Sequence, residues 1–331
     1  MKAEQEVFAN GIAHDVWRNW WMADTTKRHD AAGTYPDGTT AYAIGDADQY
    51  YNQIDGIWKG LIDDAVAHAS ATDNDVRRVT IANGAVAMVD TITLTGTSGT
   101  ATITLKGKAY TATFDTTLTA TATAFAAANL SELSQRRIDV TSSTVDLIFT
   151  SSIAGVSIGT TSIANATGDL DGTLANTTAN TAQAALTTDE AQDTFKEMFR
   201  NAHKGLRKVP KAQMRYYATR SMIENYEDTL TADTLESARS AIIDGVKRWM
   251  YNGVPILEMD IDDEIADDFE GAYPHRAILS TPQNLALVIS TGNNFAETKF
   301  WFNPDENENR QRAQFEFGAD FIIPEAVIVA Y

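Results

Sequence analysis

The feature that most constrains this chain is an abrupt change of composition between residues 79 and 186. The whole chain of 331 residues has 26 Lys and Arg and 45 Asp and Glu, yet this segment holds only four basic and seven acidic residues. It is rich in Thr, Ala and Ser, and its apolar residues alternate with polar ones, as in strands with one buried face. The flanking sequence is more charged and has helical spacing. We therefore expect two folding units with different surfaces on one chain.

The less charged segment interrupts the other unit. A chain of this length has room for about two domains with cores of their own. We expect residues 1–78 and 187–331 to form one discontinuous domain, with residues 79–186 inserted into it. The two ends of the insert must then lie close together, which predicts that it can fold on its own. The mixture of strand and helix patterns predicts an α+β fold class.

Short alternating runs predict the strands of the insert, and glycine-containing turns typical of hairpins join the first three. We expect strands at residues 91–95, 102–105, 110–114, 138–140 and 145–150. An Ala-rich stretch over 123–133 predicts one helix. Residues 151–186 predict a last strand or two and a linker back to the other unit.

The N-terminal part of the flanking unit predicts helices around a loop. Residues 3–21 predict a helix or a partly ordered arm whose three tryptophans leave more apolar surface than a solitary helix tolerates. This segment must pack on something, and a neighbouring subunit is one candidate. Residues 24–50 are rich in turn residues and predict an extended loop or loose hairpin. Apolar residues at helical spacing over 49–69 predict a helix that packs on the core.

The C-terminal part predicts one long helix followed by scattered strands. Residues 189–208 carry an apolar stripe at helical spacing, and Val209-Pro210 ends it because the residue before proline avoids the α conformation. Residues 234–250 predict a mixed, partly helical segment. We expect strands at 214–218, 256–259, 277–282 and 321–331.

No pattern in the sequence predicts catalysis. The chain has no cysteine, which excludes disulfides, thiolate nucleophiles and cysteine zinc sites. Its five histidines have no metal-ligand spacing, and neither a phosphate-binding glycine loop nor a nucleophile elbow is present. We therefore predict no catalytic, cofactor-binding or metal-binding residue and no enzyme activity. The N-terminus has no signal-peptide pattern and no stretch of 18 apolar residues occurs, which predicts a soluble, non-secreted protein.

The acidic net charge of the chain has two interpretations that the sequence leaves open. The formal net charge is −19, of which the insert contributes −3, so the chain repels nucleic acid over most of its surface. This serves solubility, or it keeps DNA from sticking to the wall of a DNA-filled compartment.

A cluster of acidic residues in the C-terminal third is either a solvated face or a site for a hard cation, although it lacks the EF-hand pattern. Its members are Asp260, Asp262, Asp263, Glu264, Asp267, Asp268 and Glu270.

Short basic patches are the natural counterparts of this acidic surface. They lie at Arg77-Arg78, at Arg136-Arg137 and over Lys204–Lys211. We expect ion pairs between subunits more than nucleic-acid contacts. For the acidic cluster, the candidate basic partners are Arg207, Lys208, Lys211, Arg215, Arg310 and Arg312.

Once joined, the flanking segments resemble the major capsid proteins of tailed bacteriophages with the Hong Kong 97-type fold. The resemblance covers about two-thirds of the chain and rests on the order of its landmarks. These are the N-terminal arm, the turn-rich segment leading into Asn52–Lys59, the helix 189–208, Tyr251–Met259, Ala277–Leu287 and Phe315–Tyr331.

The resemblance implies which part of the capsid fold each segment of the chain forms. The arm would be residues 1–23, the E-loop 24–48, and the spine helix of the peripheral domain 189–208. The axial domain would run over 212–290, and the last strands would return to the peripheral domain. The insert would lie on the exterior of the shell. The chain shows no long N-terminal scaffolding segment, and nothing identifies the isopeptide-forming Lys, Asn and Glu of cross-linking relatives.

The resemblance also implies a function. We expect a protein that assembles with itself as hexamers and pentamers into an icosahedral shell around the DNA genome, in the virion and assembled in the host bacterial cytoplasm. Its partners would be a portal and scaffold or decoration proteins, with packaged double-stranded DNA touched only non-specifically, and with no membrane and no cofactor. The alternatives are a tail-tube or other virion structural protein and, more distantly, a metal-dependent hydrolase that uses Asp260–Glu270.

Overall fold

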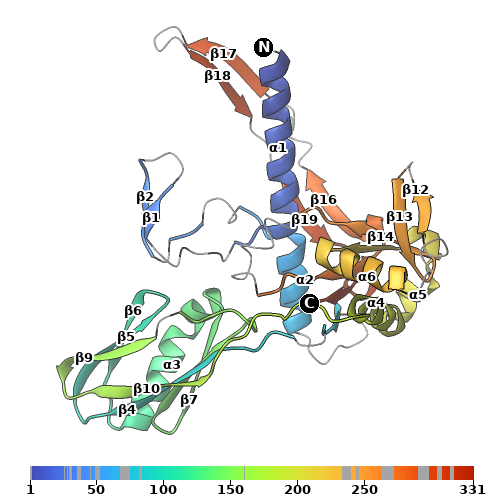
Figure 1. Cartoon of the computed structure of the whole chain (residues 1–331). Helices are drawn as coiled ribbons and strands as arrows, with labels where there is room; N and C mark the ends of the chain where they lie inside the picture. The colour runs from blue at the N-terminus through green and yellow to red at the C-terminus, as the bar shows by residue number, and fades with distance from the viewer. Residues whose placement is uncertain are drawn as a thin grey trace.

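The structure is a computed structural model of the whole chain, and it describes residues 2–25, 27, 29, 32–35, 39–44, 46–48, 53–67, 75–81, 84–159, 161–232, 240–243, 246–261, 272–289, 298–303, 308–313 and 317–331. Its helices and several separate sheets confirm the α+β class. Figure 1 shows a central body with the insert at one end and, at the other, a long N-terminal helix and a projecting hairpin. None of the described helices is long and apolar enough to cross a membrane.

A seven-stranded mixed sheet forms the centre of the body. Its order is β12-β13-β14-β11-β15-β20-β3, with β11 parallel to β14 and β20 parallel to β3. The bounds are Arg77–Val79 for β3, Arg215–Ala218 for β11, Ser240–Ile243 for β12, Val246–Tyr251 for β13, Val254–Glu258 for β14, Ala277–Ser280 for β15 and Ile328–Ala330 for β20. Every residue of β15 and β20 is buried, as expected of central strands covered on both faces.

Helices cover both faces of this sheet because successive residues of a strand point to opposite sides. Ile278 of β15 packs in a core with Trp21 and Trp58, whereas its neighbour Leu279 packs in a second core with Phe195. The first core contains residues of helix α2, Ile57–Ala67, and the second contains residues of helices α4, Glu190–Asn201, and α6, Arg220–Ala232. The body is thus a sheet between two helical layers.

The N-terminal elements agree with the sequence predictions. Helix α1 covers Lys2–Met22, and strands β1, Gly33–Thr34, and β2, Ala41–Tyr42, pair as a loose hairpin. Helix α2 begins at Ile57, later than predicted, and buries the expected apolar stripe. Close packing joins the two helices, since a side chain at Gly56 would place its Cβ 2.7 Å from the Ala23 main-chain nitrogen.

The insert has the strands and the helix that its pattern predicts. They are β4 Val89–Thr95, β5 Gly99–Leu105, β6 Lys108–Thr113, α3 Leu118–Gln135, β7 Ile138–Ser143, β8 Asp146–Ser151, β9 Ser162–Gly168 and β10 Asp171–Thr178. They form two sheets, β10-β4-β8-β7 and β6-β5-β9. Thr117 begins α3 because its Oγ1 accepts a hydrogen bond from the Ala120 main-chain N–H at 3.1 Å. A third core lies between the sheets and α3.

The insert leaves and rejoins the body through two adjacent chain segments. Val86 on the outgoing segment and Thr181 on the returning one form an antiparallel bridge. One loop of the inserted sequence also enters the body, because Ile153 and Val156 are buried in the same core as Trp58. Residues from the segment 79–186 therefore pack both in the core of the insert and in the core of the body.

Three predicted elements differ from the structure. The single strand expected over 321–331 is wrong: strand β19, Phe317–Phe321, ends at the first of these residues, a 3-10 turn covers Pro324–Ala326, and β20 covers only Ile328–Ala330. The single long helix expected over 189–208 is wrong: α4 ends at Asn201, Ala202 and His203 have non-helical backbone angles, and a short helix α5 covers Lys204–Lys208. The interruption is stabilised locally, since the His203 Nδ1 accepts the Gly205 N–H at 3.1 Å and so caps α5. In the described part of 234–250, strands β12 and β13 replace the expected partly helical segment.

Two smaller sheets complete the body. β16, Leu285–Ile289, pairs with β19, Phe317–Phe321, beside α1 and α2. β17, Thr298–Asn303, pairs with β18, Glu308–Ala313, in the hairpin that projects at the same end of the molecule as α1.

Candidate interaction surfaces

The base of α1 is fixed to the body by tryptophans. Trp21 is fully buried, and the indole Nε1 of Trp20 donates a hydrogen bond to the Ala286 main-chain oxygen at 3.1 Å. The ring centroids of Trp20 and Trp21 lie 4.5 Å apart, and that of Trp17 lies 5.2 Å from Trp20. Trp17 nevertheless keeps 43% of its surface exposed. The aromatic cluster thus begins in the core and ends at the surface.

An apolar groove runs along the exposed side of this cluster. Its volume is about 470 Å³, and we call it the α1 groove; its lining residues are Ala9, Ile12, Ala13, Val16, Trp17, Trp20 and Leu287. The lining contains no charged residue. Leu287 in this lining is 41% exposed. Exposed apolar residues that line one groove are typical of surfaces that contact another molecule.

Two hairpins extend from the body (Figure 1). In the β1–β2 hairpin, the His29 ring stacks on Tyr42 with centroids 3.7 Å apart, and Tyr35 packs edge-on against Tyr42 at 4.8 Å. In the β17–β18 hairpin, Trp301 is 44% exposed. Both hairpins thus carry aromatic side chains away from the core.

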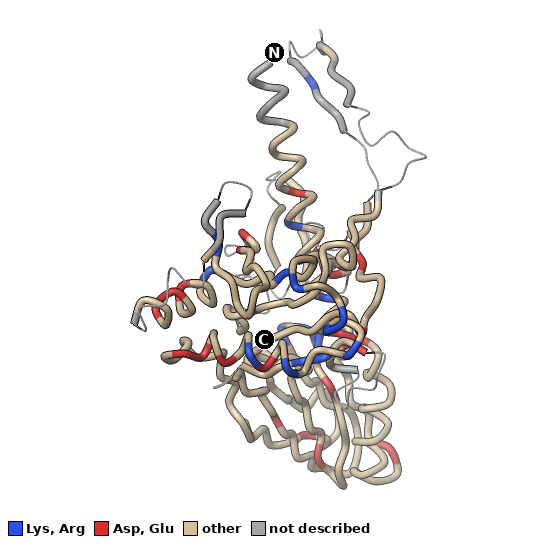
Figure 2. Tube along the Cα trace, turned by 90° about the vertical axis from the view of Figure 1, so that its right-hand side faces the viewer, with Lys and Arg blue, Asp and Glu red and all other residues tan. Residues whose placement is uncertain are grey.

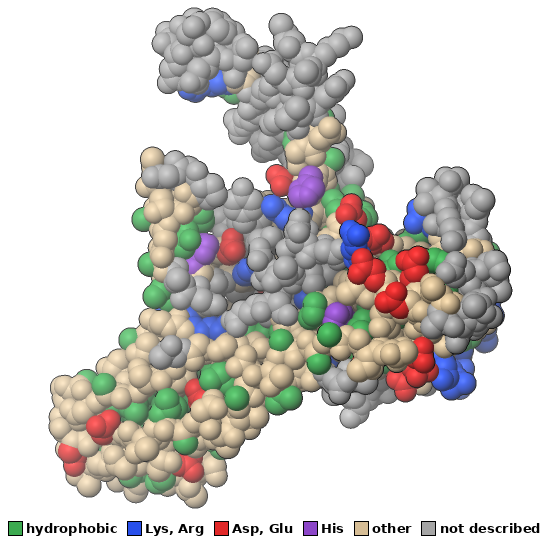
Figure 3. Space-filling model, viewed as in Figure 1, with side chains coloured by type: hydrophobic (Ala, Val, Ile, Leu, Met, Phe, Trp, Pro, Cys, Tyr) green, Lys and Arg blue, Asp and Glu red, His purple; other side chains and the backbone are tan. Residues whose placement is uncertain are grey.

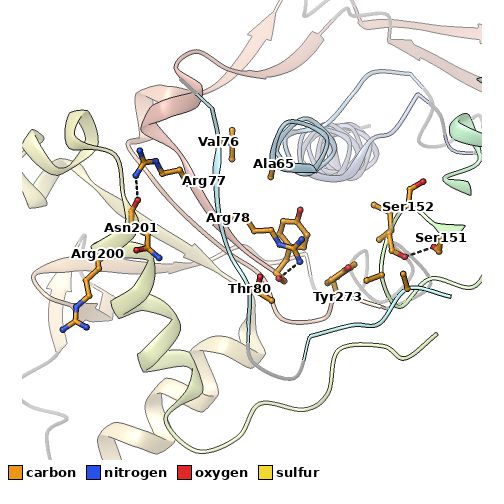
Figure 4. A pocket seen from close by; sticks show the side chains of 14 residues that line it. Ala65, Val76, Arg77, Arg78, Thr80, Ser151, Ser152, Arg200, Asn201 and Tyr273 are labelled. Carbon is orange, nitrogen blue, oxygen red and sulfur yellow. Dashed lines mark hydrogen bonds between the residues drawn. The ribbon is translucent and has the colours of Figure 1, made fainter. Parts of the chain in front are cut away.

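A cavity of about 740 Å³ lies where β3, α2 and the base of the insert meet. Its lining includes Arg77, Arg78 and Arg200 and no Asp or Glu side chain. Figure 4 shows Arg78 on one side of β3, and Arg77 and Arg200 on the other side. The three guanidinium groups therefore do not converge on one point of the cavity.

These arginines connect elements of the body. Arg77 Nη1 donates a hydrogen bond to the main-chain oxygen of Asn201 at 2.9 Å, at the end of α4. The Arg78 guanidinium lies 4.0 Å from the Tyr331 ring centroid, and its Nη2 donates to the Tyr331 main-chain oxygen at 3.3 Å. Burial raises the pKa of the Tyr331 hydroxyl to about 12. The predicted patch at Arg77-Arg78 thus joins β3 to α4 and β20.

The other predicted charged sites are partly described. Asp262 to Glu270 of the acidic cluster lie outside the described residues, and Asp260 has left-handed backbone angles with φ +49°. Lys211 Nζ donates to Asn252 Oδ1 at 2.9 Å, and Arg215 Nη1 donates to the main-chain oxygens of Ala212 and Met214. Figure 2 shows Lys and Arg gathered in the body and few charged positions along the insert. Within the described chain, no three His, Asp or Glu side chains come together as a metal site.

Sequence reasoning missed one contact between a histidine and a serine. The Nδ1 of His275 lies 2.7 Å from the Ser221 hydroxyl, and the His275 main-chain N–H donates to the Gln183 Oε1 at 2.9 Å. Burial lowers the pKa of His275, and the charge of Glu190 opposes that change. Because 54 residues separate the two side chains, no local pattern signals the contact. His275 thus joins Gln183, on the segment that returns from the insert, to Ser221 of α6.

Comparisons with known proteins give little information. No family model and no curated protein matches the chain. A solved structure from Mycobacterium phage Che8 is 16% identical, with a TM-score of 0.31, over 44% of this chain and 50% of that one. The chain thus matches half the length of that phage structure. So low a TM-score does not establish a shared fold.

Proposed function

We propose that this protein is a structural protein of a tailed bacteriophage, the major capsid protein that assembles with copies of itself into the shell around the genome. The observation that carries the proposal is the α1 groove, an uncharged apolar surface on a projecting helix. The resemblance noted in the sequence agrees with it. The interrupted helix α4–α5 does not match the expected spine, so the proposal relies on the α1 groove instead.

The physical reason is the cost of leaving such a surface in water. Burial of apolar surface is worth roughly 25 cal/mol for each Å², so a groove that contains Trp17 and Leu287 gains stability when another molecule covers it. A net charge of −19 opposes close approach of copies, and contacts through uncharged surfaces reduce that repulsion. Extended elements that carry apolar side chains suit a shell, in which each subunit reaches over its neighbours.

The tail-tube alternative requires a different architecture. A tube subunit would close a β-barrel-like ring with its neighbours, whereas the largest described sheet is an open mixed sheet with helices on both faces. No observation on the described residues favours the hydrolase alternative, whose acidic cluster lies largely outside them.

Electron microscopy and sedimentation of the purified full-length protein test the proposal. We expect closed shells, or hexamers and pentamers that form shells when the salt concentration rises and screens the acidic surface. Stacked rings or tubes would support the tail-tube alternative. A protein that remains monomeric at all salt and protein concentrations, and when expressed in bacteria with its neighbouring phage genes, would contradict both.

A further inference from the structure

The insert has two outer strands on the side opposite its helix. β9 is the last strand of one sheet and pairs with β5, and β10 is the last strand of the other sheet and pairs with β4. Helix α3 packs against β7 and β6, which are the outer strands on the other side. Within the described residues, β9 and β10 each have one partner strand.

Both strands are exposed along most of their length. In β9 only Ile163 is half-buried, and in β10 only Gly172 and Thr178 are, while all other side chains of the two strands are exposed on both faces. Leu174, in the middle of β10, is 37% exposed. The space-filling view shows this end of the molecule with few charged groups (Figure 3). A strand edge in water with this exposure leaves alternate N–H and C=O groups free to pair with another strand.

The usual protection of an outer strand is missing from β10. Natural edges carry lysines, prolines or a covering helix, whereas β10 has one charged residue, Asp171 at its start, and no proline. Its one irregularity is a register shift between Asn176 and Thr178 at its far end. On β9, by contrast, the Asn165 side-chain amide donates to the main-chain oxygens of Gly168 and Leu170, at 3.2 and 2.8 Å. The edge of β10 is therefore the more open of the two.

We propose that the edge of β10 pairs with the edge of β10 in a second copy of this chain, as an antiparallel two-fold contact between inserts. Three properties of β10 favour its own copy as the occupant. A two-fold contact uses the same surface on both copies, so an uncharged strand meets an uncharged strand. The insert contributes only −3 to the net charge of −19, so copies that approach through it repel least. Figure 1 also shows that the insert, which carries β10, extends from the body.

The inference deepens the proposed function, because it rests on self-assembly and names a surface that links neighbouring subunits. Antiparallel two-fold pairing places a residue on the axis opposite its own copy, or the two residues that flank the axis opposite each other, with Cα atoms about 4.5–5.5 Å apart, which is within the range for a disulfide. Because the chain has no cysteine, a single introduced cysteine reports on one position without background.

Cysteine cross-linking in the full-length protein tests the pairing. Thr173→Cys, Leu174→Cys and Ala175→Cys are oxidised mildly, each alone and in pairwise mixtures, because the two-fold axis passes either through a residue or between two. Thr111→Cys, on an exposed position of β6, is the matched control. We expect at least one β10 variant or mixture to form disulfide-linked dimers at least tenfold faster than the control. Equal rates for all β10 variants and the control would overturn the proposal.

A lysine substitution gives a second test, in which β10 pairing and a general charge effect predict opposite changes in self-association. Ala175→Lys places a charge on the edge and should lower self-association at least tenfold by sedimentation, whereas Thr111→Lys should not. Both variants make the protein less acidic, so a general charge effect would strengthen association in both and would contradict the proposal. Shells without β10 cross-links would overturn the pairing and leave the proposed function intact. Cross-linked dimers that never form shells would support the pairing and contradict the capsid assignment.

Discussion

Arg137 of the insert forms an ion pair with Asp24, which follows α1 in the sequence. The two side chains are 18% and 10% exposed, and a second guanidinium nitrogen of Arg137 lies 3.7 Å from Asp63 Oδ1 of α2. Arg137 has left-handed backbone angles, with φ +59°, at the turn between α3 and β7. One side chain therefore connects the insert, the base of α1 and α2, and a conformation unfavourable for arginine is kept at that point.

Removal of either partner should loosen the insert on the body. Arg137→Met and Asp24→Asn should each lower the free energy of unfolding by about 1–3 kcal/mol, because the remaining group is largely buried and has lost a charged hydrogen bond. A double-mutant cycle in urea should show a coupling energy between the two positions. Lys196→Met is the control, since the exposed Lys196–Asp193 pair should contribute less than about 0.5 kcal/mol. Additive effects of Arg137→Met and Asp24→Asn would contradict a stabilising ion pair between the two side chains.

Two tryptophans of α1 should separate assembly from stability. Trp17→Ala removes a side chain that is 43% exposed in the α1 groove, so the melting temperature should change little while assembly falls sharply. Trp21→Ala removes a fully buried side chain and should cost about 3–5 kcal/mol of stability. Calorimetry and sedimentation of both variants check this. Normal assembly by Trp17→Ala would show that the α1 groove is not an interface.

Local patterns in the sequence predicted the elements whose side chains face one core. In β5, Ala101, Ile103 and Leu105 are all buried and alternate with less buried threonines, so the pattern of period two is visible in the sequence. The stripe of α2 was equally visible, because Ile57, Trp58, Leu61 and Ile62 share one helix face.

Features that depend on distant residues could not be predicted in this way. The break after α4 depends on the His203 cap and lies within an apolar stripe that continues to the buried Leu206, so periodicity alone favoured one helix. Ile153 lies in the insert sequence but packs in the body core, which no composition boundary indicates. Whether residues 79–186 fold alone therefore stays a prediction.

Asp169 should make the insert sensitive to acid. Its carboxylate accepts hydrogen bonds from the main-chain N–H and the hydroxyl of both Thr97 and Ser98, at 2.6–2.9 Å, and these bonds lower its pKa from 3.8 to about 2. A lowered pKa means that the unfolded chain binds the proton more readily. The stabilisation is therefore present above pH 4 and lost as the pH falls towards 2. Asp169→Asn should lower the melting temperature at pH 7, and the difference from the wild type should vanish near pH 2.

His275 should also make the body less stable in acid. Because histidine is a base, this loss should occur at a higher pH than the loss from Asp169. Burial lowers the pKa of its imidazole, so the folded protein takes up a proton less readily than the unfolded chain, whose histidine titrates near pH 6.5. The unfolded state then binds more protons below that pH, and the free energy of unfolding should fall as the pH falls from about 7 to 5. The charged group that opposes this is Glu190, whose attraction favours the protonated ring and so limits the loss.

The neutral variant His275→Gln isolates this contribution. It removes the titration and should flatten the dependence of the urea midpoint on pH between 7 and 5, even where it is less stable than the wild type. Ser221→Ala removes the hydroxyl 2.7 Å from Nδ1 but keeps the titrating ring, so its stability should still fall with pH. The two variants separate loss of the contact from loss of the charge change. Equal slopes for the wild type and His275→Gln would show that another group causes the acid sensitivity of the body.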